Sequence, residues 1–170
     1  AIVKYLGNCA GMNKETSVIA VVQSLYQCIS GGYNAERDWR RYTSLFLPNA
    51  VITVISSTSD NNTRIIDSTT VANYIDYFIR VIGDMPFYEK EVTHRIEFMD
   101  SYAIYWSDYE ARLNLSSEPI YKGTNCFQLV FHEDKWSFIS ALWERKLKAE
   151  HLSQYFQPQL TSEPIPSGTG

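Results

Sequence analysis

The sequence predicts a single α+β domain in which helices cover one face of a curved sheet. Apolar side chains recur with a helical period in the first half of the chain, and the period changes to two from Phe87 onward. The connections between the later strands are short, which favours an antiparallel meander. With 170 residues, 45% of them hydrophobic, and no internal repeat or linker, the chain suits one domain with a substantial core.

Two helices are expected first. The opening helix runs over residues 13–30, because its apolar side chains repeat every three to four positions on one face; these are Val18, Val22, Leu25 and Ile29. Gly31 and Gly32 would end it. A second helix is expected over 36–47, and Pro48 would end it because the residue before a proline is disfavoured in a helix.

Strands dominate the rest of the chain. A β-branched strand is expected at 50–56, a short returning strand at 64–67, and then a third helix that Ser68 caps and Gly83 ends. The change of period predicts four long strands, at 87–99, 102–113, 121–131 and 135–144. On the first of these, alternation places the polar residues 89, 91, 93, 95 and 97 on one face.

Composition narrows the classes of protein and partner. Residues 13–148 are expected to form the domain, with a leader segment at 1–12 and a polar, proline-rich tail at 149–170. The net charge of -4 argues against a nucleic-acid partner. No apolar run approaches the roughly 20 residues of a membrane span. Three cysteines without CxxC spacing indicate reduced thiols in a cytoplasmic protein.

Neither face of the later strands is uniformly apolar. Tyrosines, an asparagine and a serine stand among large apolar side chains on 102–113 and 121–131. Hydroxyls and amides among aromatic rings are typical of a concave small-molecule pocket. The same pattern would arise if the polar groups satisfied one another or buried water, or if the second sheet face were half-buried in a dimer. The histidines lack metal-ligand spacing and no phosphate-binding loop occurs, so neither a metal nor a cofactor is expected.

Two stretches carry a resemblance to a known family. The segment from Trp39 to Val51 and the closing strands from Gly123 to Trp143 resemble the nuclear transport factor 2-like superfamily, especially its SnoaL-like members of uncharacterised function. The resemblance covers about residues 14–145. It implies a cone-shaped, cystatin-like fold, in which three N-terminal helices pack in a strongly curved antiparallel sheet. It also implies a pocket inside the cone and a homodimer formed through the sheet.

The resemblance leaves three functions open, because this superfamily holds enzymes, binding modules and structural subunits. The first is a small-molecule-binding protein for an apolar or aromatic molecule with polar handles. The second is a cofactor-independent isomerase, cyclase or dehydratase that works by acid–base chemistry in the cone. The third is a structural subunit resembling a dioxygenase small subunit, which would need a large partner chain and no pocket of its own.

The resemblance also implies where a site would lie. Acid–base chemistry would draw on Asp38, His94 and Tyr109, although Asp38 also suits the first turn of a helix. Only His94 lies on a cone-forming strand, so the histidine pattern of the dehydratases is incomplete. Arg112 would hold a carboxylate if it points inward; otherwise Arg95, Arg112 and Glu110 would pair across the sheet with charges on neighbouring strands. The residues expected to bind the ligand are Trp39, Tyr42, Glu91, Tyr105, Ser107, Arg112, Asn125 and Trp143.

Overall fold

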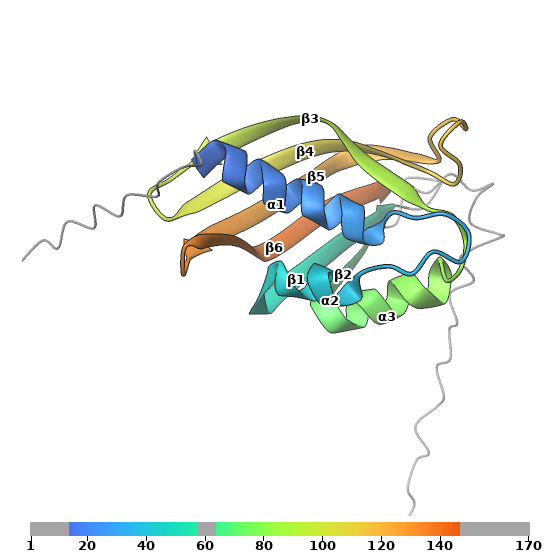
Figure 1. The fold of residues 1–170 in the computed structure, drawn as a ribbon, viewed down its shortest axis with the longest axis horizontal. Helices are drawn as coiled ribbons and strands as arrows, with labels where there is room; N and C mark the ends of the chain where they lie inside the picture. Colours follow the sequence, from blue (N-terminus) through green and yellow to red (C-terminus); the bar gives the residue numbers. More distant parts are fainter. Residues whose placement is uncertain (1–13, 58–63, 147–170) are drawn as a thin grey trace, which may run out of the picture.

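The computed structural model describes residues 14–57 and 64–146, so the predicted segments 1–12 and 149–170 lie outside the described residues. The predicted α+β class and the order of the elements are confirmed (Figure 1). In sequence the elements are α1 (Lys14–Ile29), α2 (Trp39–Ser44), β1 (Phe46–Ser57), β2 (Arg64–Thr70), α3 (Val71–Val81), β3 (Tyr88–Phe98), β4 (Tyr102–Arg112), β5 (Tyr121–His132) and β6 (Lys135–Lys146).

One six-stranded sheet carries the fold, in the order β2-β1-β6-β5-β4-β3. Strands β3 to β6 form the predicted antiparallel meander. The expectation of a wholly antiparallel sheet is wrong at one place, because β1 runs parallel to β6. A parallel pair needs a long crossover, and here the chain makes it through β2, α3 and the meander. The sheet curves, with α1 lying across one face and α2 and α3 gathered beside β1 and β2 (Figure 1).

The second helix is shorter than predicted, and Pro48 does not end it. Helix α2 spans only six residues and gives way to β1 at Phe46. The Phe46 ring packs against Phe138 at a centroid distance of 4.9 Å, and the carbonyl oxygen of Leu45 accepts a hydrogen bond from the Phe138 backbone. Pro48 lies where the register between β1 and β6 shifts, a place that tolerates a residue without an N–H. Tertiary packing therefore draws 46–48 into the sheet.

The third helix begins two residues later than predicted. Strand β2 continues to Thr70, whose hydroxyl oxygen accepts a hydrogen bond from the Asn73 backbone and caps α3. Ser68, the predicted cap, instead bonds to the Thr53 hydroxyl across the β1–β2 pair at 2.9 Å. Gly83 follows the helix at a φ of 53°, a conformation that glycine adopts without strain, so its predicted role as a terminator agrees with the backbone.

A β-bulge in β3 overturns the predicted alternation. The register shifts between Glu91 and Thr93. Before the shift, Glu89 and Glu91 stand opposite Ala111 and Tyr109; after it, His94 and Ile96 stand opposite Ser107 and Tyr105. A bulge adds one residue to one strand and so reverses which side chains face inward beyond it. Positions 93, 95 and 97 therefore do not share a face with 89 and 91.

The core lies between α1 and the concave face of the sheet. Its fully buried side chains come from both layers and include Val18, Val22, Tyr105, Phe127, Leu129 and Phe138. The Trp136 indole donates a hydrogen bond to the Ser17 hydroxyl and ties the start of α1 to β6. Burying each large apolar side chain stabilises the fold by about 1.5–3 kcal/mol. None of the helices in the described ranges has the length and apolarity to cross a membrane.

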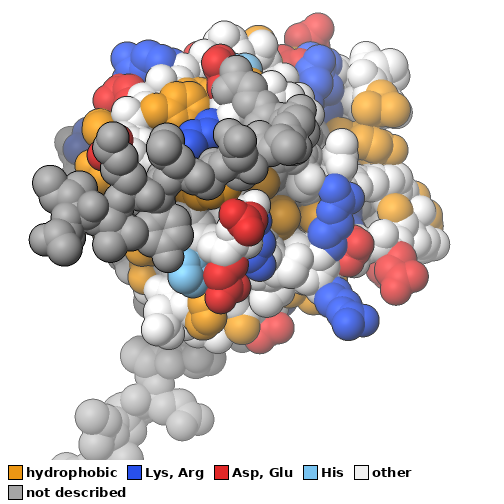
Figure 2. All heavy atoms as spheres, turned by 60° about the vertical axis from the view of Figure 1, so that its left-hand side comes forward, with side chains coloured by type: hydrophobic (Ala, Val, Ile, Leu, Met, Phe, Trp, Pro, Cys, Tyr) orange, Lys and Arg blue, Asp and Glu red, His pale blue; other side chains and the backbone are white. Residues whose placement is uncertain are grey.

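The molecular surface mixes charge and apolar side chains. On the face shown in Figure 2, acidic and basic groups alternate with hydrophobic ones, and neither sign of charge dominates. A mixed surface of this kind matches the small net charge of the whole chain.

Candidate functional site

A cavity of about 110 Å³ opens between the helices and one end of the concave sheet. A single buried water needs roughly 10–15 Å³ of such space, so the cavity has room for a small organic molecule. Twenty residues line it, and half are aromatic: Tyr42, Phe46, Tyr74, Tyr77, Phe78, Phe87, Tyr109, Tyr121, Phe127 and Trp143. The remaining polar side chains in the lining are Glu89 and Asn125.

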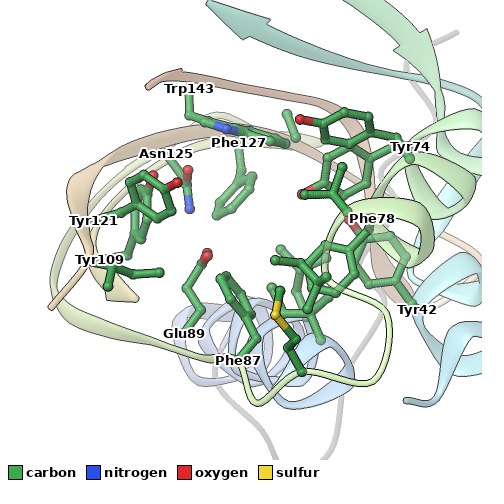
Figure 3. Close-up of a pocket in the computed structure, with 18 of the residues that line it drawn as sticks. Tyr42, Tyr74, Phe78, Phe87, Glu89, Tyr109, Tyr121, Asn125, Phe127 and Trp143 are labelled. Atoms are coloured by element: carbon green, nitrogen blue, oxygen red, sulfur yellow. The ribbon is translucent and has the colours of Figure 1, made fainter. Parts of the chain in front are cut away.

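The cavity has a polar end and an aromatic end (Figure 3). Glu89 directs its carboxylate inward, and Asn125, Tyr109 and Tyr121 lie together on the side away from α3. Tyr42, Tyr74 and Phe78 form the opposite wall. This division matches the usual plan of a small-molecule site, an apolar body with a few placed polar groups.

Helix α3 supplies much of the aromatic wall because Tyr74 and Phe78 lie four positions apart on one helix face. The Tyr74 ring meets Trp143 edge-on at 5.4 Å, and Phe78 meets Phe87 edge-on at 5.3 Å. Edge-to-face pairs of this kind are favoured by the ring quadrupoles. The helix wall is therefore held to β6 and to the start of β3.

Glu89 owes its position to a short pairing between the end of α1 and the start of β3. The backbones of Gly31 and Phe87 exchange hydrogen bonds of 2.8 and 2.9 Å. The Ser30 hydroxyl accepts from the Glu89 N–H at 3.0 Å and donates to the Glu89 carbonyl at 3.1 Å. A Cβ at Gly31 would lie 2.7 Å from the Cβ of Ala35, so only glycine fits there. These contacts set both Phe87 and Glu89 in the cavity wall.

Tyr109 lies over a glycine on the next strand. It pairs with Gly123 in the β4–β5 register, and a Cβ at Gly123 would lie 3.1 Å from the Tyr109 ring. An interior glycine in a strand often marks a close approach of another group. The absent side chain leaves room for the tyrosine ring at the polar end of the cavity.

A chain of buried hydrogen bonds leaves the cavity through Asn125. The Asn125 amide donates to the Tyr26 hydroxyl of α1 at 2.9 Å, and Tyr26 lies 2.7 Å from the Ser107 hydroxyl. Ser107 donates to a Glu91 carboxylate oxygen at 2.6 Å. A hydroxyl group has one proton, and Ser107 donates its proton to Glu91. Tyr26 is therefore the donor in the hydrogen bond between Tyr26 and Ser107. Every proton in this chain is therefore directed toward Glu91.

Glu91 is the end point of that chain and accepts further contacts. Its second oxygen accepts from the Tyr105 hydroxyl at 3.0 Å and lies 2.7 Å from the His94 ring nitrogen Nδ1. Burial, reinforced by the charge and hydrogen bond of Glu91, raises the pKa of Tyr105 far above its usual value. Burial, followed by the charge of Glu89, does the same for Tyr26. Both hydroxyls therefore remain protonated donors.

The predicted site residues divide into three groups. Tyr42, Tyr109, Asn125 and Trp143 line the cavity. Glu91, Tyr105, Ser107 and His94 form the hydrogen-bonded cluster beside it, which matches the alternative that polar groups satisfy one another. The third group, Asp38, Trp39 and Arg112, lies outside both.

Each residue of the third group has a local role. Exposed Asp38 caps α2 by accepting a hydrogen bond from the Arg41 backbone at 2.9 Å. Trp39 stands behind the cavity wall, with its ring 5.3 Å from Phe78. Arg112 bonds to Glu110 at 2.8 Å and to the Ser117 carbonyl. The Arg112 hydrogen bond, with help from Lys90, lowers the pKa of Glu110. Arg112 thus pairs along its own strand, and the ion pair across the sheet is the one between Lys90 and Glu110 at 3.2 Å.

Glu89, and Tyr74 and Phe78 of α3, line the cavity but were not predicted from the sequence as site residues. Glu89 lies two positions from Glu91 on a strand, so alternation alone signalled that the two share a face. The spacing of Tyr74 and Phe78 signalled an inner helix face, although not that a cavity lies beneath it. Tyr26 carried the same helical signal on α1.

Metal-binding groups are sparse in the described part of the chain. Within residues 14–57 and 64–146, no three His, Cys, Asp or Glu side chains lie together as metal ligands would. Cys28 and Cys126 are free thiols, and burial raises the pKa of each. A raised thiol pKa disfavours the reactive thiolate.

Comparison with solved structures places the fold. A protein of unknown function from Shewanella baltica OS155, described as NTF2-like, is 18% identical with a TM-score of 0.51, covering 78% of this chain and 96% of that one. The β subunit of a candidate aromatic-ring-hydroxylating dioxygenase from Novosphingobium aromaticivorans is 10% identical with a TM-score of 0.57, covering 78% and 89%. A candidate scytalone dehydratase from the same organism is 14% identical with a TM-score of 0.53, covering 75% and 80%.

These similarities define the architecture. The chain has the NTF2-like, cystatin-like fold, and the predicted resemblance is confirmed at that level. No protein-family model and no curated protein matches the sequence. One fold of this kind serves several unrelated functions, so function has to be argued from the cavity.

Proposed function

We propose that this protein binds a small apolar or aromatic molecule that carries a polar handle. The supporting observation is the cavity itself, which is half aromatic and has Glu89 and Asn125 at one end. The aromatic wall would bury the body of the ligand, while the polar end would orient its handle. A structural subunit was expected to have no pocket of its own. The cavity therefore favours the small-molecule-binding function over the structural-subunit function.

Acid–base catalysis is a second candidate, and one observation favours it. The Glu89 carboxylate is directed into a largely apolar cavity that Tyr109 also lines. A carboxylate base opposite a tyrosine donor suits proton transfer next to a carbonyl group. Asp38 and His94, the acid–base groups predicted from the sequence, do not line the cavity. Under this candidate function, Glu89 would be the acid–base group instead. Under this candidate, Glu89→Gln would abolish turnover and leave the affinity for a neutral ligand nearly unchanged.

The predicted homodimer through the sheet remains a proposal. Ile139 and Leu142 of β6 and Val51 of β1 are large apolar side chains that the isolated chain leaves exposed. Covering them with a second copy would remove apolar surface from water. Light scattering coupled to gel filtration would report a mass of two chains if this proposal is correct, and of one chain if it is wrong.

Binding can be tested with 2-phenylethanol, a neutral aromatic alcohol, by following the tryptophan indole signals in two-dimensional NMR spectra. Trp143 lines the cavity, whereas Trp106 and Trp136 do not, so the protein carries its own controls. We expect saturable movement of the Trp143 signal with a Kd of about 1 mM, the range for a ligand of this size. Equal movement of all indole signals, or none at saturation, would contradict a cavity site.

A cavity-filling variant sharpens the test. Ala141 lines the cavity from β6, and Ala141→Leu adds bulk there without adding charge. We expect the affinity for 2-phenylethanol to fall at least about fivefold while the fold is retained, since modest overpacking costs about 1–3 kcal/mol. Unchanged affinity in a folded Ala141→Leu protein would place the ligand elsewhere.

A further inference from the structure

The electrostatics of the cavity point in one direction. Of its twenty lining residues, Glu89 is the one with a formal charge, and the lining contains no lysine, arginine or histidine. The Glu89 carboxylate is directed inward (Figure 3). In surroundings of low dielectric constant, a single charge acts over a longer distance than it does in water. A ligand in this cavity would therefore meet a negative potential.

The influence of Glu89 reaches residues on two other elements. Burial is the largest cause of the raised pKa of Tyr26 on α1 and of Tyr42 on α2, and the Glu89 charge adds to it in both cases. Tyr42 belongs to the aromatic end of the cavity, across from Glu89 (Figure 3). Glu89 therefore acts electrostatically on side chains of both α1 and α2.

Nearby cations are already committed to other groups. Arg37 donates hydrogen bonds to the carbonyl oxygens of Ile29, Gly83 and Met85, at 2.8–2.9 Å. Lys90 and Arg112 both contact Glu110, at 3.2 and 2.8 Å. Glu110 lies on the other face of β4 from Tyr109, and neither Lys90 nor Arg112 belongs to the lining of the cavity.

The aromatic lining adds to the same preference. The face of an aromatic ring carries negative potential and attracts a cation within about 6 Å of its centre, with tryptophan and tyrosine more effective than phenylalanine. Six of the ten aromatic residues in the lining are tyrosine or tryptophan. A carboxylate has about four acceptor positions and can accept from more than one donor at a time.

We propose that the polar handle of the ligand is a protonated amine, so that the cavity selects an organic cation with an apolar body. This inference rests on the proposed function and names the ligand class of the same site. The ammonium group lies beside Glu89 at the polar end, and the body of the ligand packs against the wall formed by α3. An anionic ligand is disfavoured because it would bring a like charge into a site of low dielectric constant.

Three probes with one aromatic body test this preference. Phenethylamine is a cation at pH 7, 2-phenylethanol is neutral and nearly isosteric with it, and phenylacetate is an anion. We expect phenethylamine to bind the wild-type protein at least about tenfold more tightly than 2-phenylethanol, and phenylacetate to bind most weakly. The movement of the Trp143 signal in NMR titrations gives all three Kd values. This order decides the ligand class without any variant.

Two matched variants of β3 identify the responsible group. Glu89→Gln removes the charge in the cavity, whereas Glu97→Gln removes a charge from the same strand at a side chain that is 48% exposed. We expect Glu89→Gln to bring the Kd of phenethylamine to within about twofold of that of 2-phenylethanol. Glu97→Gln should preserve the tenfold difference.

The outcomes separate the inference from the proposed function. If 2-phenylethanol binds at Trp143 and phenethylamine binds no more tightly, the cation preference is wrong and the binding function stands. If the preference survives in a folded Glu89→Gln protein, the inference is overturned as well. If none of the probes binds, both the cation preference and the proposed function fail.

Discussion

Glu89 and Glu91 are the same residue type, two positions apart on the same face of β3, and their surroundings differ sharply. Glu91 accepts hydrogen bonds from Ser107 and Tyr105 and contacts His94, so its carboxylate belongs to a packed polar cluster. Glu89 directs its carboxylate into a cavity. One carboxylate completes a hydrogen-bonded cluster in the protein interior, and the other lines the cavity that we propose as a ligand site.

The difference follows from where α1 ends. Tyr26 of α1 lies above the sheet at the level of Ser107 and closes the space around the Glu91 cluster. Helix α1 ends at Ile29, and the hydroxyl of Ser30, the next residue, bonds to the backbone of Glu89. Two identical side chains therefore have different surroundings because Tyr26 of α1 packs beside Glu91, whereas α1 ends before Glu89.

The largest expected effect is on stability, and it separates the two carboxylates. Glu91→Gln should lower the free energy of unfolding by about 2–3 kcal/mol, because an amide has one acceptor atom and turns an N–H₂ group toward buried donors. Glu89→Gln should cost about 1 kcal/mol or less. Urea denaturation at pH 7 measures both, with exposed Glu97→Gln as the control near zero. Equal losses for Glu89→Gln and Glu91→Gln would mean that the two sites are not distinct.

Alkaline pH tests the cluster through Tyr26. The pKa of Tyr26 is raised in the folded protein, so above pH 10 the unfolded chain loses a proton that the folded chain keeps. The free energy of unfolding then falls with rising pH, by about 1.4 kcal/mol per pH unit for each such tyrosine. We expect Tyr26→Phe to make that slope shallower by about this amount between pH 10 and 11. An unchanged slope would mean that Tyr26 ionises freely in the folded state.

Ser30→Ala tests what positions Glu89. The substitution removes two hydrogen bonds to the Glu89 backbone, so we expect a loss of about 1 kcal/mol in stability and a severalfold weaker affinity for phenethylamine. The NMR signals of the His94 ring should stay in place, because Glu91 is held from β4 and α1. Ser44→Ala, which removes a hydroxyl that bonds only to its own helix, is the matched control. Loss of the His94 signals together with ligand affinity would show that the two regions are coupled.

The smallest effect concerns the packing of Tyr109. Gly123→Ala would press a methyl group against the Tyr109 ring, which would have to move by a few tenths of an ångström. We expect the free energy of unfolding to fall by about 0.5–1 kcal/mol and the affinity for phenethylamine to weaken two- to threefold. Tyr109→Leu removes the obstacle, so Gly123→Ala should be nearly neutral in that background, as a double-mutant cycle would measure. Additive effects would place the strain elsewhere.

Much of the architecture could be predicted because its signals are local. The stripe of Val18, Val22 and Leu25 predicted α1, and the change of period at Phe87 predicted the meander. The parallel pairing of β1 with β6 had no such signal, because it joins segments about ninety residues apart. The length of α2 was also decided from a distance, by the packing of Phe46 against Phe138.

The site was partly predictable for the same reason. Tyrosines and Asn125 among apolar strand residues predicted polar groups inside, and Tyr42, Tyr109, Asn125 and Trp143 do line the cavity. By itself, the sequence determined the class of fold and the kinds of side chain available to its interior. The tertiary structure decided which of the two inward carboxylates lines the cavity and which joins the cluster around Tyr26 and Ser107. Periodicity is a property of neighbouring residues and can be seen in the sequence. The packing of a concave face depends on side chains that are distant in sequence, and the sequence pattern does not show which of them meet there.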